Sequence, residues 1–320
     1  MSQIRRWSFL VLKRCLPLIA LIFPLLTGCP SGQSETSNSS PEKAAVRIGF
    51  IPSENMEEIQ RNSQPLIDMM SKKIGREVQP FIATDYTGIV EAFRGGKLDA
   101  AFLTPASYVM ANSEAGVKVI LKAQRGDKPF YHSIIFTRQD AGVNQLTDLK
   151  GKTFAFGDTL STAGYIYPLK MLKAQGINPA TDFDNLIFSG GHDATVLAVF
   201  NKKVVAGATY ANDPKGDDAA WKHLLKPEEA KQLKILAVSD AIPSDNICIS
   251  KDIAPELAKQ VQDFFIELSK DPEGQKLIQK LYRIDSFVPA TDEDYQGIRS
   301  AFSEAGIEVK KELSASGKGK

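Results

Sequence analysis

The chain has 320 residues, of which 43% are hydrophobic and 24% are charged, as in an ordinary globular protein with one large or two moderate domains. Residues 1–28 hold four basic residues and no acidic one, so the rest of the chain keeps 35 basic and 38 acidic residues, a net charge of −3. This weakly negative balance gives no reason to expect a nucleic-acid partner.

An export signal is predicted at residues 1–28. Basic residues precede the apolar run 15–26, which has only 12 residues, whereas a membrane-spanning helix needs about 20. The run ends in Leu26-Thr27-Gly28-Cys29. This ending resembles a bacterial lipobox, which implies cleavage before Cys29 and attachment of a diacylglyceryl group to its sulfur. The alternative is an ordinary signal peptide with an incidental cysteine.

The segment after Cys29 predicts a protein that is anchored to a membrane rather than spanning it. Residues 29–45 are rich in Ser and poor in apolar side chains, which is typical of a flexible, solvated tether. Cys15 leaves with the signal and Cys29 would carry the lipid, so Cys248 has no partner for an internal disulfide. Cys248 lies in an apolar run and is predicted to be a small core residue.

From residue 46 onward the chain alternates strand-like and helix-like segments, which predicts α/β lobes with mainly parallel sheets. The strand candidates are 46–52, 77–83, 98–105, 117–124, 132–138, 146–158, 185–190, 204–210 and 233–239. The helix candidates are 56–75, 88–96, 163–174, 193–201, 254–270 and 273–282.

A weak similarity between two segments of the chain favours two lobes. Residues 87–105 and 193–210 each contain a short amphipathic helix, a basic turn and an apolar strand that ends in Thr or Tyr. Chance similarity between two such units is the alternative. Two lobes would enclose a cleft, and ligands of open α/β sheets bind beyond the carboxyl ends of the strands.

Three junctions between a strand and a helix place polar side chains at a helix start. They carry Tyr86, the pair Ser161 and Thr162, and His192. Helix starts have unpaired N–H groups and partial positive charge, so three of them aimed at one point would bind a small oxyanion. Taken singly, each residue has a plainer interpretation: a cap for Ser161 or Thr162, a packed or capping His192, and a core-edge Tyr86.

Enzyme motifs are absent from the sequence. The chain has three His residues, none in a metal-binding spacing, and it has no G-x-S-x-G, P-loop or G-x-G-x-x-G motif. A hydrolase built on Ser161, His192 and an Asp can be drawn, but no nucleophile elbow surrounds Ser161. We therefore expect no catalytic residue, no metal and no cofactor.

The chain from Val46 to Gly306 resembles the solute-binding proteins of phosphonate, phosphite and phosphate ABC importers. The matching stretches are TDYTGIVEAFRGGKLDAAFLTPASYVMA (84–111), YHSIIFTR (131–138), LTDLKGKTFAFGDTLSTAGYIYPLKML (146–172), SGGHDATVLAVFNKKVVAGATY (189–210), IPSDNICIS (242–250) and DEDYQGIRSAF (292–302). A lipobox also fits this family, whose members are often tethered lipoproteins.

The resemblance implies an α/β type II periplasmic-binding-protein fold with a central ligand cleft between two lobes. Lobe 1 would comprise residues 46–137 and 247–310, lobe 2 residues 138–246, and residues 311–320 would form a flexible tail. The lobes would close around an anion and deliver it to a membrane permease. The protein would be a non-enzymatic monomer, exported to the periplasmic or cell-surface side.

The resemblance also implies a set of ligand-binding residues. Tyr86 and Tyr131 would donate hydroxyl groups from lobe 1, and Ser161 and Thr162 would donate from lobe 2 beside His192. Asp245 lies where the family often has a polar or acidic residue near the ligand; the alternative is a turn residue after Pro243. A carboxylate facing the anion would favour a protonated oxyanion over sulfate.

Two departures from the family bear on the ligand. Ala163 stands where many relatives have Ser, so it can offer only its backbone N–H. Asn212 stands where relatives that select aminoalkyl phosphonates have an acidic residue. Tyr210 and Asp213 are the alternative candidates for this position. Asn212 cannot pair with an ammonium group as a carboxylate would. We therefore expect phosphate, phosphite or methylphosphonate, with a same-fold receptor for another ligand or signalling partner, or a hydrolase using His192, as alternatives.

Overall fold

The computed structural model describes residues 45–309, and these residues belong to one compact unit. The predicted signal peptide, the predicted lipidation site Cys29, all but the last residue of the predicted tether, and the predicted tail 311–320 lie outside the described residues. Within residues 45–309, no helix combines the length and the apolar character that crossing a bilayer requires.

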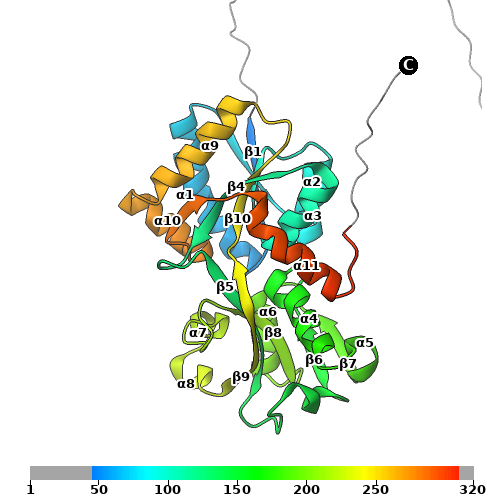
Figure 1. Cartoon of the computed structure of the whole chain (residues 1–320). Coiled ribbons are helices and arrows are strands. Elements are labelled where there is room, and N and C mark those ends of the chain that lie inside the picture. Colours follow the sequence, from blue (N-terminus) through cyan, green and yellow to red (C-terminus); the bar gives the residue numbers. More distant parts are fainter. Residues whose placement is uncertain (1–44, 310–320) are drawn as a thin grey trace, which may run out of the picture. The chain divides into compact units, whose positions relative to one another are not determined.

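The first sheet has six strands in the order β11-β4-β10-β3-β1-β2. Its strands are β1 (Val46–Phe50), β2 (Val78–Ile82), β3 (Ala100–Leu103), β4 (Lys118–Gln124), β10 (Asn246–Ile249) and β11 (Ser286–Pro289). Its helices are α1 (Met56–Ile74), α2 (Tyr86–Arg94), α3 (Pro105–Ala115), α9 (Pro255–Leu268), α10 (Pro272–Tyr282), the 3₁₀ turn η3 (Asp292–Tyr295) and α11 (Gln296–Glu304). Figure 1 shows α1, α9 and α10 on one side of this sheet and α2 and α3 on the other. We call this sheet and its helices the first lobe.

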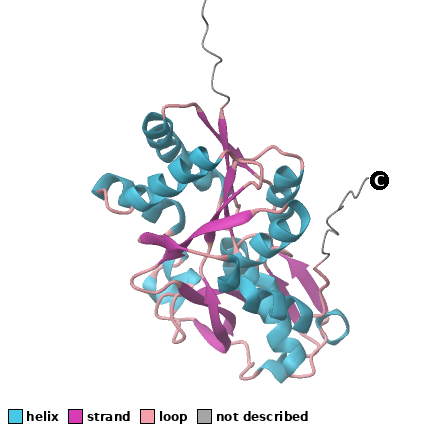
Figure 2. Ribbon diagram, turned by 45° about the horizontal axis from the view of Figure 1, so that its top comes forward, coloured by secondary structure: helices cyan, strands magenta, loops and turns pink. Residues whose placement is uncertain are grey.

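The second sheet has five strands in the order β7-β6-β8-β5-β9. Its strands are β5 (Phe130–Arg138), β6 (Thr153–Phe156), β7 (Asn185–Phe188), β8 (Ala206–Ala211) and β9 (Leu233–Pro243). Its helical segments are the 3₁₀ turn η1 (Leu146–Leu149), the π-helical turn η2 (Thr162–Ile166), α4 (Tyr167–Ala174), α5 (Pro179–Asp182), α6 (His192–Phe200), α7 (Ala220–Leu224) and α8 (Pro227–Ala230). We call this group the second lobe, and Figure 2 shows helices flanking the strands of both lobes.

The chain passes twice between the two sheets, between β4 and β5 and between β9 and β10. β5, which the predicted boundary at residue 137 assigned to the first lobe, pairs with β8 and β9 of the second sheet. The expectation of mainly parallel sheets is wrong in part. β1 with β2 and β3, and β6 with β7 and β8, run parallel, but β5, β10 and β11 pair antiparallel. β5 and β10 each follow a crossing and run antiparallel to their neighbours, and hydrophobic periodicity does not record strand direction.

Parallel strands bring several helix starts to the edge of each sheet that faces the other lobe. β3 ends at Leu103, where Thr104 caps α3 and Pro105 occupies the first turn, a position that suits proline because its missing N–H would have no partner there. β6 leads into the turn 157–161 and β7 leads into Gly191, the cap of α6. These junctions meet because carboxyl ends of parallel strands share one edge of a sheet.

A continuous apolar core joins the lobes. Buried side chains of α2 and α3 in the first lobe belong to the same cluster as buried residues of β5, β8 and α6 in the second, including Tyr108, Val109, Ile134, Phe136 and Val196. Cys248 is a fully buried free thiol in the same cluster. The predicted role of Cys248 as a small core residue is therefore confirmed.

Candidate ligand-binding site

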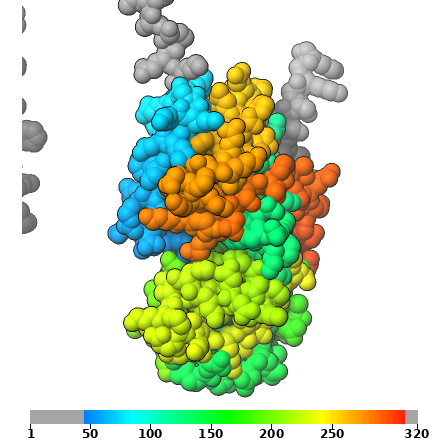
Figure 3. All heavy atoms as spheres, turned by 90° about the vertical axis from the view of Figure 1, so that its left-hand side faces the viewer, coloured from blue at the N-terminus to red at the C-terminus, as the bar shows by residue number. Residues whose placement is uncertain are grey.

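A cavity of about 40 Å³ lies between the two lobes. Its volume is a few times what one water molecule needs, about 10–15 Å³, so it suits a group of few non-hydrogen atoms. Figure 3 shows the yellow-green second lobe directly below the orange and blue parts of the first. The cavity is lined by Ile51, Ser53, Glu54, Phe102, Leu103, Thr104, Arg125, Tyr131, Ser161, His192, Tyr210, Asn212, Asp245, Asn246, Tyr282, Ile284 and Phe287.

Six of the residues singled out from the sequence lie in this wall: Tyr131, Ser161, His192, Tyr210, Asn212 and Asp245. Three others, Tyr86, Thr162 and Ala163, are buried beside it without lining it. Asp213, the competing candidate, accepts hydrogen bonds from the backbone of its own loop and lines a separate hollow at the surface. The helix starts singled out from the sequence thus lie in or beside one cavity.

The segment GDTLSTAG (157–164) uses its hydroxyl groups in two different ways. The Ser161 Oγ accepts from the backbone N–H of Gly164 at 3.0 Å, so its own hydrogen stays available to a ligand. A Cβ on Gly164 would lie 2.7 Å from that Oγ, which explains the glycine. The Thr162 Oγ1 instead accepts from the Ala106 N–H at 2.9 Å, across the boundary between the lobes.

Asp158 makes a second bond across that boundary. Its carboxylate accepts from the backbone N–H of Leu160 at 2.7 Å and from that of Tyr86, the first residue of α2, at 3.2 Å. Burial raises the pKa of Asp158, while these two backbone donors oppose the rise. Together, Asp158 and Thr162 satisfy helix-start N–H groups of α2 and α3 from the opposite lobe.

His192 is the first residue of α6 and is 7% exposed. Its Nδ1 lies 3.0 Å from Thr209 Oγ1, and its backbone N–H donates to Ser53 O in the first lobe at 3.1 Å. Burial lowers the pKa of His192 to about 4. The ring is therefore neutral at physiological pH and faces the cavity as a polar, uncharged group.

Three buried polar atoms at or beside the cavity have no hydrogen-bond partner within residues 45–309: Tyr86 Oη, Asn212 Oδ1 and Asn246 Nδ2. Leaving such an atom unpaired costs roughly 1–3 kcal/mol. Burial, reinforced by the carboxylates of Asp158, Asp245 and Glu54, raises the pKa of Tyr86 well above its usual value. Burial likewise raises the pKa of Tyr131, so both phenols remain protonated and able to donate.

Arg125 and Asp245 join the two crossings of the chain. Arg125 follows β4 and Asp245 precedes β10, and the Arg125 Nη2 lies 3.0 Å from the Asp245 carboxylate and 3.1 Å from the carbonyl oxygen of Tyr282. The Arg125 side chain is 13% exposed and that of Asp245 is 30% exposed. The pair places one cation and one anion in the cavity wall.

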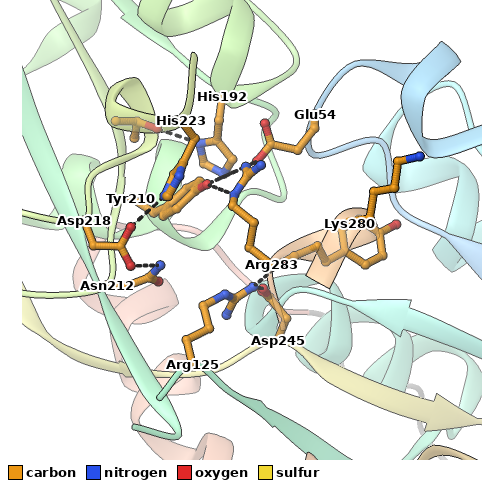
Figure 4. A network of polar contacts seen from close by, with 12 residues as sticks. Glu54, Arg125, His192, Tyr210, Asn212, Asp218, His223, Asp245, Lys280 and Arg283 are labelled. Atoms are coloured by element: carbon orange, nitrogen blue, oxygen red, sulfur yellow. Dashed lines mark hydrogen bonds and ion pairs between the residues drawn. The ribbon is translucent and has the colours of Figure 1, made fainter. Parts of the chain in front are cut away.

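A second charged cluster links the lobes at Tyr210 (Figure 4). Arg283 donates through Nη2 to Tyr210 Oη at 2.7 Å and pairs with Glu54, to which Tyr210 Oη also donates at 3.3 Å. Burial raises the pKa of Glu54 well above its usual value, and Asp193 reinforces the rise. Beyond Tyr210, Asn212 Nδ2 donates to Asp218, whose other oxygen pairs with His223.

Arg283 holds an unusual backbone conformation. It ends α10 with φ 54° and ψ 37°, a left-handed conformation that costs an L-residue about 1–2 kcal/mol and is usually left to glycine. Lys202 is the other non-glycine residue with positive φ among residues 45–309.

The sequence interpretation missed Glu54 and Arg125, the charged groups of the wall, and Arg283, which lies behind it. Glu54 and Arg125 each follow a strand of the first sheet closely, so the rule that ligands bind beyond strand ends could have found them. Arg283 follows a helix and carries no such signal. Within residues 45–309, no cluster of three or more His, Cys, Asp or Glu side chains could hold a metal ion.

Comparison with curated proteins gives two relatives of similar length. The chain is 31% identical over 251 residues to the phosphonates-binding periplasmic protein of Escherichia coli (strain K12), covering 77% of this chain and 72% of that protein. It is also 31% identical over 309 residues to the phosphate-import protein PhnD of Mycolicibacterium smegmatis, covering 91% of this chain and 94% of that protein.

Solved structures show the same fold. A binding protein component of an ABC phosphonate transporter from Pseudomonas aeruginosa matches with a TM-score of 0.74 and 25% identity, covering 82% of this chain and 86% of that one. PhnD1 from Prochlorococcus marinus matches with a TM-score of 0.72 and 21% identity, covering 82% and 98%. The α/β fold of a two-lobed periplasmic binding protein is therefore confirmed.

The family model for the periplasmic substrate-binding protein of phosphonate ABC transporters matches residues 48–295. Its members and the similar structures are substrate-binding proteins of transporters and not enzymes, which confirms the expectation of a binding protein and implies export to the periplasm. The chain belongs to the family of periplasmic substrate-binding proteins of phosphonate ABC transporters.

Proposed function

We propose that this protein is a lipid-anchored, monomeric receptor that captures a small phosphorus oxyanion between its lobes and delivers it to an ABC permease in the cytoplasmic membrane. Phosphate, phosphite and methylphosphonate are the candidate ligands. The observation that carries the proposal is the interlobe cavity, with hydroxyl, amide and guanidinium donors from both lobes in or beside its wall.

The donors suit an oxyanion. Ser161 has a free hydroxyl hydrogen, Asn246 has an unpaired amide nitrogen, and Arg125 supplies a positive charge. The oxygens of a tetrahedral anion can accept hydrogen bonds from all three donors, and charge-assisted hydrogen bonds are stronger than neutral ones. Asp245 offers an acceptor for a hydroxyl hydrogen of the ligand, which a protonated phosphorus oxyanion has and sulfate lacks.

The size and charge of the wall favour a ligand with a small substituent. The cavity measures about 40 Å³. Part of its wall is apolar, formed by Ile51, Phe102 and Ile284, and this part suits a methyl group or a hydrogen on phosphorus. The carboxylates at the wall already have cationic partners, Glu54 with Arg283 and Asp245 with Arg125. An ammonium group on the ligand would have to displace one of these partners.

The relatives support the ligand class. One is named for phosphonates, one for phosphate import, and a further relative from Prochlorococcus marinus, 22% identical over 266 residues, for phosphite. The structure of PhnD1 from the same organism is a complex with methylphosphonate. These names cover the three candidate ligands without choosing among them.

Calorimetric titration of the protein from residue 30 onward, stripped of ligand by partial unfolding, tests the proposal. Phosphate, phosphite, methylphosphonate, 2-aminoethylphosphonate and sulfate are injected in parallel. We expect one small phosphorus anion to bind tightly and sulfate to give no heat. Ser161→Ala should weaken binding, whereas Ser269→Ala, at the end of α9 in the first lobe, should not. If none of the five anions gave a heat of binding, the proposal would be wrong.

The lipid anchor needs its own test because Cys29 lies outside the described residues. In cells that express the full chain, Cys29→Ser should move the protein from the membrane fraction to the soluble fraction. Cys15→Ser, which alters the predicted signal instead, should leave the protein in the membrane fraction. A wild type that is already in the soluble fraction would show an ordinary cleaved signal peptide, and membrane association that survives Cys29→Ser would show another mode of attachment.

A further inference from the structure

Arg283 holds two residues of the cavity wall from outside the cavity (Figure 4). Glu54 and Tyr210 line the cavity, whereas Arg283 lines two neighbouring hollows. Its guanidinium donates to Tyr210 Oη through Nη2 at 2.7 Å and through Nε at 3.2 Å, and it pairs with Glu54. Glu54 borders both the cavity and one of these hollows, so the guanidinium binds a residue that the two spaces share.

The hollow behind Glu54 is rich in acceptors. It measures about 80 Å³ and is bordered by Glu54, Glu58 and Asp193 and by Asn62 of α1, whose Nδ2 donates to Lys280 O of α10. Asn62 is 9% exposed, and its Oδ1 has no hydrogen-bond partner within residues 45–309. Lys280 and His223 also border the hollow. Three carboxyl groups and a free amide oxygen make this space suitable for a cationic group, and Arg283 borders the hollow as well.

We propose that Arg283 is a specificity-determining residue: its guanidinium takes the place that a cationic substituent of the ligand would occupy. The inference rests on the proposed function above and deepens it. With Arg283 present, Glu54 is neutralised and a second cation is repelled, so aminoalkyl phosphonates are excluded. Without Arg283, the cavity and the hollow join, and Glu54 and Asp193 face the substituent of the ligand.

The backbone of Arg283 supports this assignment independently. Its φ of 54° is a conformation in which glycine is the usual residue. An arginine at such a position is held there by contacts of its side chain, and those contacts are with Tyr210 and Glu54. Arg283→Gly therefore removes the guanidinium and relieves the backbone at the same time, so this variant is expected to fold.

The test compares affinities for 2-aminoethylphosphonate and methylphosphonate by calorimetry in the wild type, Arg283→Gly and Arg283→Lys. We expect Arg283→Gly to raise the affinity ratio in favour of 2-aminoethylphosphonate by about tenfold, which corresponds to 1.4 kcal/mol. Arg283→Lys keeps the charge and should keep most of the exclusion. In Arg283→Gly/Glu54→Gln the gain should disappear, because the ammonium group then loses its carboxylate partner.

Lys280→Met is the matched control. Lys280 lies on α10 and borders the same hollow, but within residues 45–309 it makes no bond to Tyr210 or Glu54. A ratio that changes by less than about twofold in Arg283→Gly, or equally in Lys280→Met, would overturn the proposal. A wild type that prefers 2-aminoethylphosphonate would overturn it as well while leaving a phosphorus-anion receptor in place. If no variant binds any phosphorus anion, both the proposed function and this inference fail.

Discussion

Two kinds of hydrogen bond between the lobes differ in what they depend on. At the starts of α2 and α3, backbone N–H groups of Tyr86 and Ala106 donate to the side chains of Asp158 and Thr162. At the cavity, side chains bond to side chains, as Arg283 and Glu54 of the first lobe do with Tyr210 of the second. The first kind depends on main-chain geometry and is indifferent to which anion is bound. The second kind surrounds the ligand, so it is where selectivity can be changed.

Asp158→Ala should have the largest effect. It leaves the buried N–H groups of Tyr86 and Leu160 without acceptors, at roughly 1–3 kcal/mol each. Because only the Tyr86 bond crosses between the lobes, affinity should fall by about 10- to 100-fold for every anion that binds, with their ratios unchanged. Titration of two phosphorus anions measures both quantities.

The control for this prediction is Asp85→Ala, which removes the cap of the same helix from within the first lobe. It should lower stability without lowering affinity to the same extent. An equal loss of affinity in both variants, or a changed ratio of affinities in Asp158→Ala, would contradict the separation of the two kinds of contact.

His192 bonds to the first lobe through its backbone N–H and faces the cavity with its ring, and pH acts on the ring alone. Its pKa is about 4 in the folded protein and about 6.5 in an unfolded chain. Below pH 6.5 His192 binds a proton in the unfolded chain but not in the folded protein, so the free energy of unfolding falls as the pH drops. The free energy of unfolding should decrease by up to about 3 kcal/mol between pH 6.5 and 4 on account of this residue.

Urea unfolding at several pH values measures this loss. His192→Gln should flatten the dependence, whereas His223→Gln, at a residue that is exposed near the surface, should not. The ring is neutral above pH 5.5, so anion affinity should not follow its protonation there. An unchanged slope in His192→Gln would show that other groups control this range.

Tyr210→Phe should have a smaller effect that falls on the second kind of contact. It removes the hydroxyl that lies between Arg283 and Glu54, a loss of about 1 kcal/mol or roughly fivefold in affinity. The ratio between methylphosphonate and phosphate should shift as well. Tyr108→Phe, which removes a hydroxyl bonded to Asp292 at 2.6 Å within the first lobe, should alter stability alone. Equal affinities in Tyr210→Phe and the wild type would contradict this role.

Lys170→Ala should have the smallest effect. Lys170 on α4 pairs with Glu304 on α11 at 3.1 Å, with side chains that are 27% and 52% exposed. Such pairs contribute about 0–1 kcal/mol because water and salt screen them. Affinity should change by less than about twofold at physiological salt, and a larger loss in titration would mean that this rim contact controls closure.

Much of the fold follows from local patterns. The predicted helix 56–75 agrees with α1 because its apolar spacing, Asn55 cap and Gly75 end all act within the segment. The predicted runs 254–270 and 273–282 agree with α9 and α10 for similar reasons. The direction of β5 and β10 depends instead on where the chain crosses between the sheets, which is a tertiary property.

The residues of the site also differ in whether the local sequence reveals them. Ser161 and His192 could be found because a helix start is encoded by a few neighbouring residues. Arg283 could not, because it follows a helix and meets Glu54, 229 residues away in sequence, only in the folded chain. Sequence also could not tell that Thr162 would accept from Ala106 rather than lie in the cavity wall, since both uses need the same hydroxyl at the same helix start.

The caps supplied across the lobes have a consequence for the closure that the proposed function requires. If the lobes separate, the N–H groups of Tyr86 and Ala106 lose the oxygens of Asp158 and Thr162 and turn toward water. Because unpaired N–H groups at helix starts attract anions, we expect the open protein to offer its ligand a first binding position there. Closure would return those N–H groups to Asp158 and Thr162, and we expect the anion to move into the cavity in the same step.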